Sequence, residues 1–154
     1  MKTNYKHTQI GYLIIIVFSI VILFFSLILL QTGLDGISLG VLAVLVLAGG
    51  IFSSLSVMVT EYQVKLHFTF GVFRTSFPLM KIKSVRVVRN PWYYGWGIHF
   101  TMRGWVYNVS GFSAVELELI NGTRYRIGSD DASALAEAIA TALKANSSIH
   151  PPLE

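Results

Sequence analysis

The sequence lacks cysteine altogether and is poor in charge. Without cysteine there can be no disulfide framework, no thiolate nucleophile and no cysteine-ligated zinc or iron–sulfur site. Charged residues make up only 13% of the 154 residues and hydrophobic residues make up 53%. The charged share is about half that of an ordinary soluble domain. This composition excludes a typical soluble globular domain and favours the membrane class.

Two long segments carry no charge at all. Residues 10–30 form the first, which as a helix would span roughly 30 Å, the thickness of the hydrocarbon core of a bilayer. Residues 37–58 form the second. The segment between them, 31–36, contains two glycines and Asp35 and is typical of a turn. We therefore predict a transmembrane hairpin, with one helix at 10–30, an extracytoplasmic turn at 31–36 and a second helix at 37–58.

The charges that flank this hairpin predict its orientation. Lys2 and Lys6 precede the first helix. Lys65 and Arg74 follow the second helix, and the turn contains neither lysine nor arginine. By the positive-inside rule, the N-terminal segment at residues 1–9 and the rest of the chain lie in the cytoplasm. We expect a two-span protein of the cell membrane with both termini cytoplasmic.

One face of the second predicted helix carries small residues. They are Gly36, Gly40, Ala43, Gly50 and Ser54. Small residues at helical spacing let two helix backbones approach closely. We favour packing of this face against the chain's own first helix, and the alternative is the seam of a homodimer.

After the helices, the sequence changes to short segments of alternating apolar and polar residues, separated by Gly, Pro or Asn. Seven strands are predicted, at residues 59–70, 72–77, 81–89, 97–102, 104–110, 114–120 and 123–128. Residues 129–131 supply an N-cap and acidic side chains for a helix at 132–144, whose apolar residues recur every four positions. A domain at 59–147 and a flexible tail at 148–154 complete the predicted organisation.

Basic and aromatic residues gather in one stretch of this domain. They are Lys81, Lys83, Arg86, Arg89, Trp92, Tyr93, Tyr94 and Trp96. Such a mixture suits anionic lipid headgroups, because each nearby Lys or Arg contributes about 1 kcal/mol and Trp and Tyr settle at the interface. We predict contact with lipid or with a partner protein here. Alternatively, the rings close one end of the fold and the basic residues keep an edge strand soluble. Nucleic acid, which can use the same residue types, is not expected.

No catalytic, metal-binding or cofactor-binding motif accompanies this stretch. The four histidines are scattered, and none forms a pair four residues apart or a His-Glu-x-x-His sequence. Glu116 and Glu118 share one strand face, which a solvated surface explains better than acid–base chemistry. We expect no enzyme, metal or cofactor. A deep pocket lined by several of His67, His99 and the two glutamates would contradict that expectation.

Several motifs taken together resemble a known family. They are Asn90-Pro-Trp-Tyr-Tyr-Gly-Trp-Gly-Ile98, Gly104-Trp-Val-Tyr-Asn-Val-Ser-Gly111, Ala114-Val-Glu-Leu117, Asn121-Gly122 and Arg126-Ile-Gly-Ser-Asp-Asp131. With the strand and helix order, this set resembles the small bacterial membrane proteins that carry a pleckstrin-homology (PH)-like domain behind two transmembrane helices. The match covers about residues 57–145. It implies an α+β, mainly-β domain: a seven-stranded, partly open barrel capped by the C-terminal helix.

The predicted function is that of a membrane-anchored, non-enzymatic PH-like module, which displays a protein- or lipid-contact surface at the cytoplasmic leaflet. The alternative is a structural subunit of a homo-oligomer or of a larger membrane complex. Eukaryotic PH domains that bind phosphoinositides carry several basic residues on their first two strands. Here that hairpin contains only Lys65 and Arg74, and its tip at residues 70–72 is apolar. We therefore expect no phosphoinositide pocket at that place.

Overall fold

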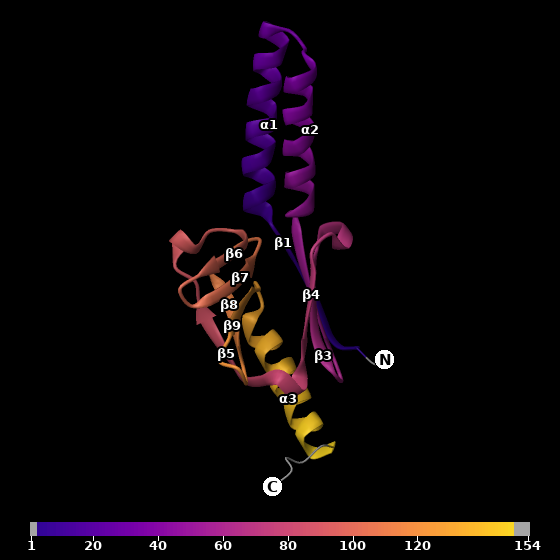
Figure 1. The fold of residues 1–154 in the computed structure, drawn as a ribbon, viewed down its shortest axis with the longest axis vertical. Helices are drawn as coiled ribbons and strands as arrows, with labels where there is room; N and C mark the ends of the chain where they lie inside the picture. The colour runs from indigo at the N-terminus through magenta and orange to yellow at the C-terminus, as the bar shows by residue number, and fades with distance from the viewer. Residues whose placement is uncertain (1–2, 150–154) are drawn as a thin grey trace.

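Two helices project from one end of a sheet-rich domain, and a third helix packs against both of its sheets (Figure 1). This computed structural model describes residues 3–149, with side chains described for residues 3–146. The helices are α1 (Tyr12–Thr32), α2 (Gly36–Ile51) and α3 (Ala132–Ile149). The chain thus consists of an apolar helical projection, α1 and α2, and one folded unit that contains the sheets and α3.

The first sheet, sheet A, contains four antiparallel strands in the order β1-β2-β3-β4. Their bounds are Thr3–Ile10 for β1, Ser54–Thr60 for β2, Gln63–Phe68 for β3 and Arg74–Pro78 for β4. Side chains alternate along each strand, so on β3 Val64 and Leu66 are buried while Lys65 and His67 lie on the outer face. The helical projection is inserted between two neighbouring strands of this sheet, β1 and β2.

The second sheet, sheet B, contains five strands in the order β5-β8-β9-β7-β6. Their bounds are Ile82–Arg89 for β5, Gly97–Thr101 for β6, Gly104–Asn108 for β7, Ser113–Leu119 for β8 and Arg124–Gly128 for β9. Strands β7 and β9 are parallel, and the other neighbours are antiparallel. Asn121 and Gly122 form the predicted β8–β9 hairpin turn, in which Gly122 has a φ of 83°.

One hydrophobic core lies between the inner faces of the two sheets and α3. Leu66 of sheet A, Leu117 of sheet B, and Leu135 and Ile139 of α3 are each at most 2% exposed. Leu135 and Ile139 belong to the predicted four-residue stripe, so the C-terminal helix is confirmed. It continues to Ile149, and the rest of the expected tail at 148–154 lies outside the described residues.

The prediction of two transmembrane helices is wrong. Within residues 3–149, only α1 is long and apolar enough to cross a membrane, with a mean hydropathy of 3.4. Helix α2 has 16 residues and is about 24 Å long, which is shorter than the hydrocarbon core of roughly 30 Å. The expected second span at 37–58 therefore ends at Ile51, and its last residues belong to β2.

The uncharged segment at 37–58 contains both the end of a helix and the start of a strand, so its pattern of buried side chains changes within it. On β2, Leu55 and Val57 are buried in the core, whereas Ser56 lies between them on the outer face. An uncharged apolar run looks the same in a membrane helix and in a buried strand until the partner strand is known. That partner is β1 (Thr3–Ile10). Most of β1 lies in the N-terminal segment at 1–9, for which the sequence predicts no strand. Thr8 Oγ1 and Ser56 Oγ lie 2.7 Å apart across the two strands.

The predicted seven-stranded, partly open barrel is also wrong. The described residues form nine strands in two separate sheets, because residues 3–10 and 54–60 add two strands. The parallel pairing of β7 and β9 gives sheet B an order that no simple up-and-down barrel has. Strands β4 to β9 nevertheless each begin and end within two residues of a predicted range.

Candidate functional site

The helical projection is joined to the sheets without a flexible linker. Gly11 alone connects β1 to α1, and Phe52 and Ser53 alone connect α2 to β2. The backbone N–H of Gly11 donates a hydrogen bond to Ser53 O (2.7 Å). This bond links the β1–α1 connection to the α2–β2 connection. A Cβ on Gly11 would lie 3.1 Å from the backbone oxygens of Phe52 and Val109, which places the segment after β7 against the joint. One end of the domain is therefore fixed at the base of the helices.

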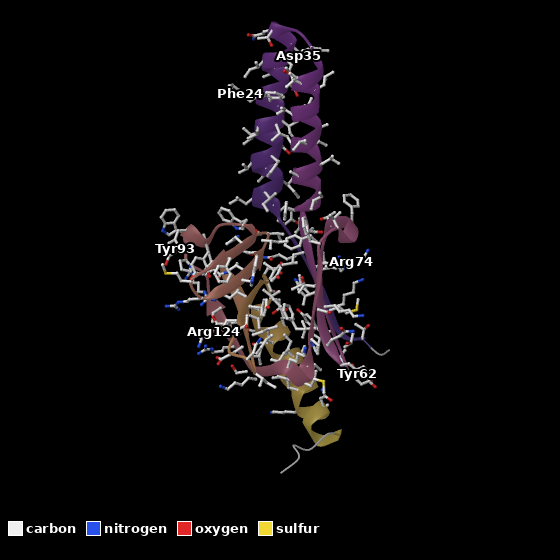
Figure 2. The ribbon with its side chains drawn as sticks, viewed as in Figure 1. Phe24, Asp35, Tyr62, Arg74, Tyr93 and Arg124 are labelled. Carbon is white, nitrogen blue, oxygen red and sulfur yellow. The ribbon has the colours of Figure 1, made fainter. Side chains whose placement is uncertain are left out.

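This end of the domain carries an exposed aromatic ring beside α2. In Figure 2, Arg74 and Tyr93 lie toward the helices, and Tyr62 lies at the opposite end of sheet A. Phe70, in the η1 turn (Thr69–Gly71) between β3 and β4, is 82% exposed. A Cβ on Gly50, in the last turn of α2, would lie 3.8 Å from the ring of Phe70. Phe70 is thus at the level where the apolar helices meet the sheets.

The backbone of Phe70 is strained. Its φ of 59° is the only positive φ of a non-glycine residue in the described chain. A left-handed backbone costs a bulky residue on the order of 1–2 kcal/mol, and such strain persists only where the surroundings hold it. A strained and exposed ring next to the apolar helix α2 points to a contact surface.

A second exposed aromatic group lies in the η3 turn (Trp92–Tyr94), between β5 and β6. Trp92 and Tyr93 are 77% and 68% exposed. Tyr94 instead covers the guanidinium of Arg126, with Cζ 5.5 Å from the ring centre. Trp96 is half-buried against the core. The structure therefore divides the predicted aromatic cluster into two rings that face outward and two that pack inward.

A buried ion pair on the outer face of sheet B holds the η3 turn. Arg126 of β9 and Glu116 of β8 are 4% and 3% exposed, and two guanidinium nitrogens lie 2.8 Å from the carboxylate. Arg126 also donates to Asn90 Oδ1 (3.2 Å), directly before the turn. Burial raises the pKa of the Glu116 carboxyl, but the hydrogen bonds and charges of Arg126 and Arg86 outweigh it and hold that pKa below its ordinary 4.5. Glu116 is therefore an ionised structural group.

The predicted basic residues do not converge on one surface. Lys83 and Arg86 lie 3.7 Å and 2.7 Å from carboxylate oxygens of the neighbouring strand β8, so their charges are neutralised there. Lys81 and Arg89 have no ion pair within the described part of the chain, but they flank opposite ends of β5, roughly 25 Å apart. Of the four predicted basic residues, two are therefore paired with carboxylates and two lie at opposite ends of β5.

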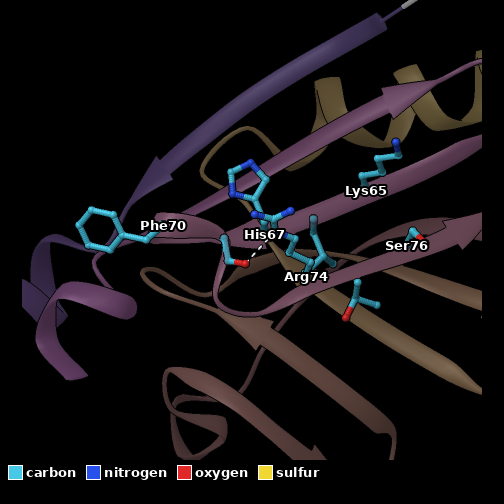
Figure 3. Close-up of a pocket in the computed structure, with 8 residues that line it drawn as sticks. Lys65, His67, Phe70, Arg74 and Ser76 are labelled. Carbon is cyan, nitrogen blue, oxygen red and sulfur yellow. Dashed lines mark hydrogen bonds between the residues drawn. The ribbon is translucent and has the colours of Figure 1, made fainter. Parts of the chain in front are cut away.

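A groove on the outer face of sheet A brings together basic residues that are separated in the sequence (Figure 3). Its volume is about 600 Å³, and its lining consists of Lys65, Leu66, His67, Phe70, Gly71, Arg74, Thr75 and Ser76. The register of the hairpin explains this, because His67 pairs with Arg74 and Lys65 pairs with Ser76. Lys65 and Arg74 thereby become diagonal neighbours on adjacent strands, roughly 7–8 Å apart.

Within the described part of the chain, no carboxylate opposes the positive charge of this groove. Neither Lys65 nor Arg74 has an ion pair with any described residue, and Glu61 lies in the β2–β3 turn at the far end of the sheet. Arg74 is held by its own turn, because its Nε donates to Gly71 O (2.7 Å). Lys6 lies in the same cross-strand row as Lys65, two strands away. The outer face of sheet A is therefore a basic surface.

No protein-family model matches this chain, and no curated protein matches it. Among the residues that the structure describes, no three His, Asp or Glu side chains are grouped so that they could hold a metal ion. His67 lies on sheet A and His99 on sheet B, so these two candidates do not meet. Burial lowers the pKa of His99, and a hydrogen bond to the backbone of Tyr94 partly opposes this.

The small residues of α2 do not make the contact with α1 that the sequence predicts. The α2 residues partly buried against α1 include Ser38, Leu42, Leu45 and Gly49. A Cβ on Gly49 would lie 3.0 Å from Phe18 of α1, but a Cβ on Gly36 or Gly40 would meet nothing within 4 Å. Ala43 is exposed, Gly50 faces Phe70 and Ser54 belongs to β2. The stripe of α2 that packs on α1 is therefore offset along the helix from Gly36, Gly40 and Ala43.

The sequence contained one signal for the groove. Lys65 and His67, and likewise Arg74 and Ser76, occupy alternate positions on the polar side of a hairpin. Alternation alone predicts which face these residues share, but the length of the η1 turn sets the register that decides which of them meet. The sequence prediction notes only that this hairpin contains two basic residues and an apolar tip, so it does not include the groove.

Proposed function

We propose that the protein is a non-enzymatic, membrane-anchored binding module that holds a contact surface against the membrane. The observation that supports this most strongly is the insertion of the helical projection between two paired strands, through joints of one and two residues. A domain on a flexible linker could turn freely, whereas a domain joined this closely keeps one end at the bilayer when α1 is inserted. The anchor therefore sets the orientation of the domain as well as its location.

The proposed side of the membrane is the cytoplasm. Strands β1 and β2 are neighbours, so residues 3–10 lie on the same side as the rest of the domain. Lys6, Lys65 and Arg74 all belong to this side. The positive-inside rule then favours the inner leaflet of the cell membrane for the domain.

Headgroups and interfacial lipid are the first contacts proposed for the helix-facing end of the domain. Phe70, Trp92 and Tyr93 are exposed there, and Trp and Tyr prefer the membrane interface. A protein or peptide partner is the second class of ligand that such an exposed surface can take. We also propose kinship with the bacterial PH-like membrane proteins over residues 57–145. That proposal does not extend to a second span or to a seven-stranded barrel.

Single cysteines test the orientation directly, because the chain has none of its own. Val72→Cys and Trp92→Cys introduce nitroxide labels near the helices, and Tyr62→Cys places a label at the opposite end of sheet A as a control. All three residues are more than half exposed. In full-length protein reconstituted in vesicles, we expect lipid-soluble oxygen to relax the first two labels and a water-soluble nickel chelate to relax the third. Equal nickel accessibility at all three sites would refute the proposal.

A structural subunit of a homo-oligomer is the second candidate, and the open face of α2 favours it. A Cβ on Gly40 would meet nothing within 4 Å, whereas Leu45 lies on the stripe that faces α1. Disulfide crosslinking in native membranes should therefore give a dimer from Gly40→Cys but not from Leu45→Cys. The absence of a dimer from both variants would exclude this arrangement.

A further inference from the structure

An apolar pocket lies between the first turns of α1 and the start of β6, and Figure 1 shows these two segments close to each other. Its volume is about 430 Å³, which is within the range typical of ligand sites. Its lining consists of Leu13, Ile14, Val17, Phe18, Phe52, Trp96, Gly97 and Ile98. This site, named the α1 pocket, therefore joins the apolar helical projection to sheet B.

The lining of the α1 pocket offers contacts to hydrocarbon and very little to a polar ligand. None of its eight residues is charged, and the indole nitrogen of Trp96 is the one polar side-chain atom among them. A charged or strongly polar molecule that entered would lose its hydration without gaining partners. The chemistry of the pocket therefore selects an apolar occupant.

The inner wall of the α1 pocket belongs to the folded unit. Phe18, Phe52 and Ile98 pack against the hydrophobic core. The ring centre of Phe52 also lies 5.3 Å from that of Phe68 and 5.8 Å from that of Phe73. These contacts hold the wall in place without a ligand, so binding does not have to order it first.

The open side of the α1 pocket continues onto the exposed apolar surface of α1. Leu13 and Val17 are 40% and 47% exposed at the pocket, and Val21, one turn further along the same face, is 42% exposed. Helix α1 is long and apolar enough to cross a membrane. When it is inserted, its first turns lie where the helix enters the bilayer, so lipid chains are the apolar groups nearest to the pocket.

We propose that the α1 pocket binds one acyl chain of a phospholipid from the membrane that holds α1. The chain packs along Leu13 and Val17 and reaches Ile98 of sheet B, with Phe18 and Phe52 beneath it. A bound chain thereby bridges the anchoring helix and the domain at a fixed site. The inference deepens the proposed function and rests on it, because it requires α1 to be inserted in the bilayer.

A photoreactive lipid tests this site in the full-length protein, reconstituted in phosphatidylcholine vesicles. The probe is phosphatidylcholine that carries a diazirine within one acyl chain, and mass spectrometry of peptides locates its attachment after illumination. Attachment to α1 and α2 is expected of any inserted helix. We expect attachment also to residues 96–98, which belong to the domain side of the α1 pocket.

Val17→Trp fills the α1 pocket, and Val21→Trp is the matched control. Both valines are exposed on the same face of α1, but Val21 does not line the pocket. Loss of contact with about two methylene groups corresponds to about tenfold in occupancy. Attachment to residues 96–98 should therefore fall about tenfold in Val17→Trp and stay unchanged in Val21→Trp. Circular dichroism melts in detergent establish that both variants fold.

Three results would overturn the proposal. The first is the absence of attachment to residues 96–98 in the wild type. The second is equal attachment there in Val17→Trp and Val21→Trp, because lipid would then reach these residues without entering the α1 pocket. The third is a disulfide-linked dimer from Ile98→Cys in native membranes, because a second copy would then cover the pocket.

Failure of this inference and failure of the proposed function give different results. If no lipid attaches to residues 96–98 while the labels at residues 72 and 92 remain in lipid, only the α1 pocket loses its ligand. If those two labels are in water while attachment to residues 96–98 still depends on Val17, the α1 pocket is supported and the proposed orientation of the domain is refuted.

Discussion

Replacing Arg126 with methionine should show how strongly the buried ion pair holds the η3 turn. The Arg126 side chain makes two contacts of 2.8 Å with Glu116 and one of 3.2 Å with Asn90, and it lies under the ring of Tyr94. Methionine keeps most of the length and the apolar contacts of arginine. It leaves the carboxylate of Glu116, which is only 3% exposed, without its buried partner.

The expected loss of stability follows from that burial. Removing one partner of a buried ion pair typically costs about 3–5 kcal/mol, because the other charge remains buried. Arg86 stays 2.7 Å from Glu116, but its side chain is 54% exposed and offsets only part of the loss. We expect the free energy of unfolding to fall by about 3 kcal/mol. At about 4 °C per kcal/mol, the melting temperature should fall by roughly 12 °C.

Arg124→Met is the matched control for this substitution. Arg124 lies two residues earlier on the same face of β9, but its pair with Glu118 is 3.7 Å long and its side chain is 43% exposed. Exposed pairs contribute about 0–1 kcal/mol, so the melting temperature should fall by at most about 4 °C. Circular dichroism melts in one detergent measure both variants. If Arg126→Met costs no more than Arg124→Met, the buried pair does not hold this region.

A second substitution separates the buried charge from the lost contacts. Adding Glu116→Gln to Arg126→Met removes the unpaired carboxylate, so the double variant should be more stable than Arg126→Met alone. Further destabilisation in the double variant would contradict the assignment of the loss to a buried charge. Nickel accessibility at a Trp92→Cys label in the Arg126→Met background reports whether the η3 turn has moved.

Two other substitutions test the pH response of the fold and the strain in the η1 turn. Burial holds the pKa of His99 below its ordinary 6.5. As the pH falls, the His99 imidazole is therefore protonated in the unfolded chain before it is protonated in the folded protein, and the folded state loses stability. The melting temperature should therefore fall more in the wild type than in His99→Gln between about pH 7.5 and about pH 5.5, and equal falls would contradict this. Phe70→Asn tolerates the left-handed backbone better, so the unfolding free energy in detergent should rise by about 0.5–1 kcal/mol. A decrease in a denaturant titration would show that the Phe70 ring stabilises the domain.

The sequence predicts β4 to β9 and α3 well because their signals are local. Alternation between buried and polar residues is visible within six residues of a strand, and the turn at Asn121 and Gly122 marks a hairpin directly. Leu135 and Ile139 identify the buried face of α3 in the same way. Each of these elements can be recognised without knowledge of the rest of the fold.

The errors concern elements whose identity depends on a distant partner. Strand β2 continues the uncharged run of α2, and only its pairing with β1 distinguishes a strand from more helix. The same limit applies to the candidate site. Lys83 and Arg86 look like a free basic surface until Glu116 and Glu118 of β8 are brought beside them, some thirty residues later in the chain. The basic groove on sheet A depends likewise on the register of β3 and β4.

The insertion of the helices between β1 and β2 also fixes an order of assembly. Ile10 pairs with Ser54, so sheet A cannot gain its first strand until residues 11–53 have been folded back on themselves. A disordered connection of that length would make the pairing of β1 with β2 entropically costly. Two helices packed against each other instead bring the ends of the two strands close together. Packing of α1 against α2 is therefore expected to precede the pairing of β1 with β2.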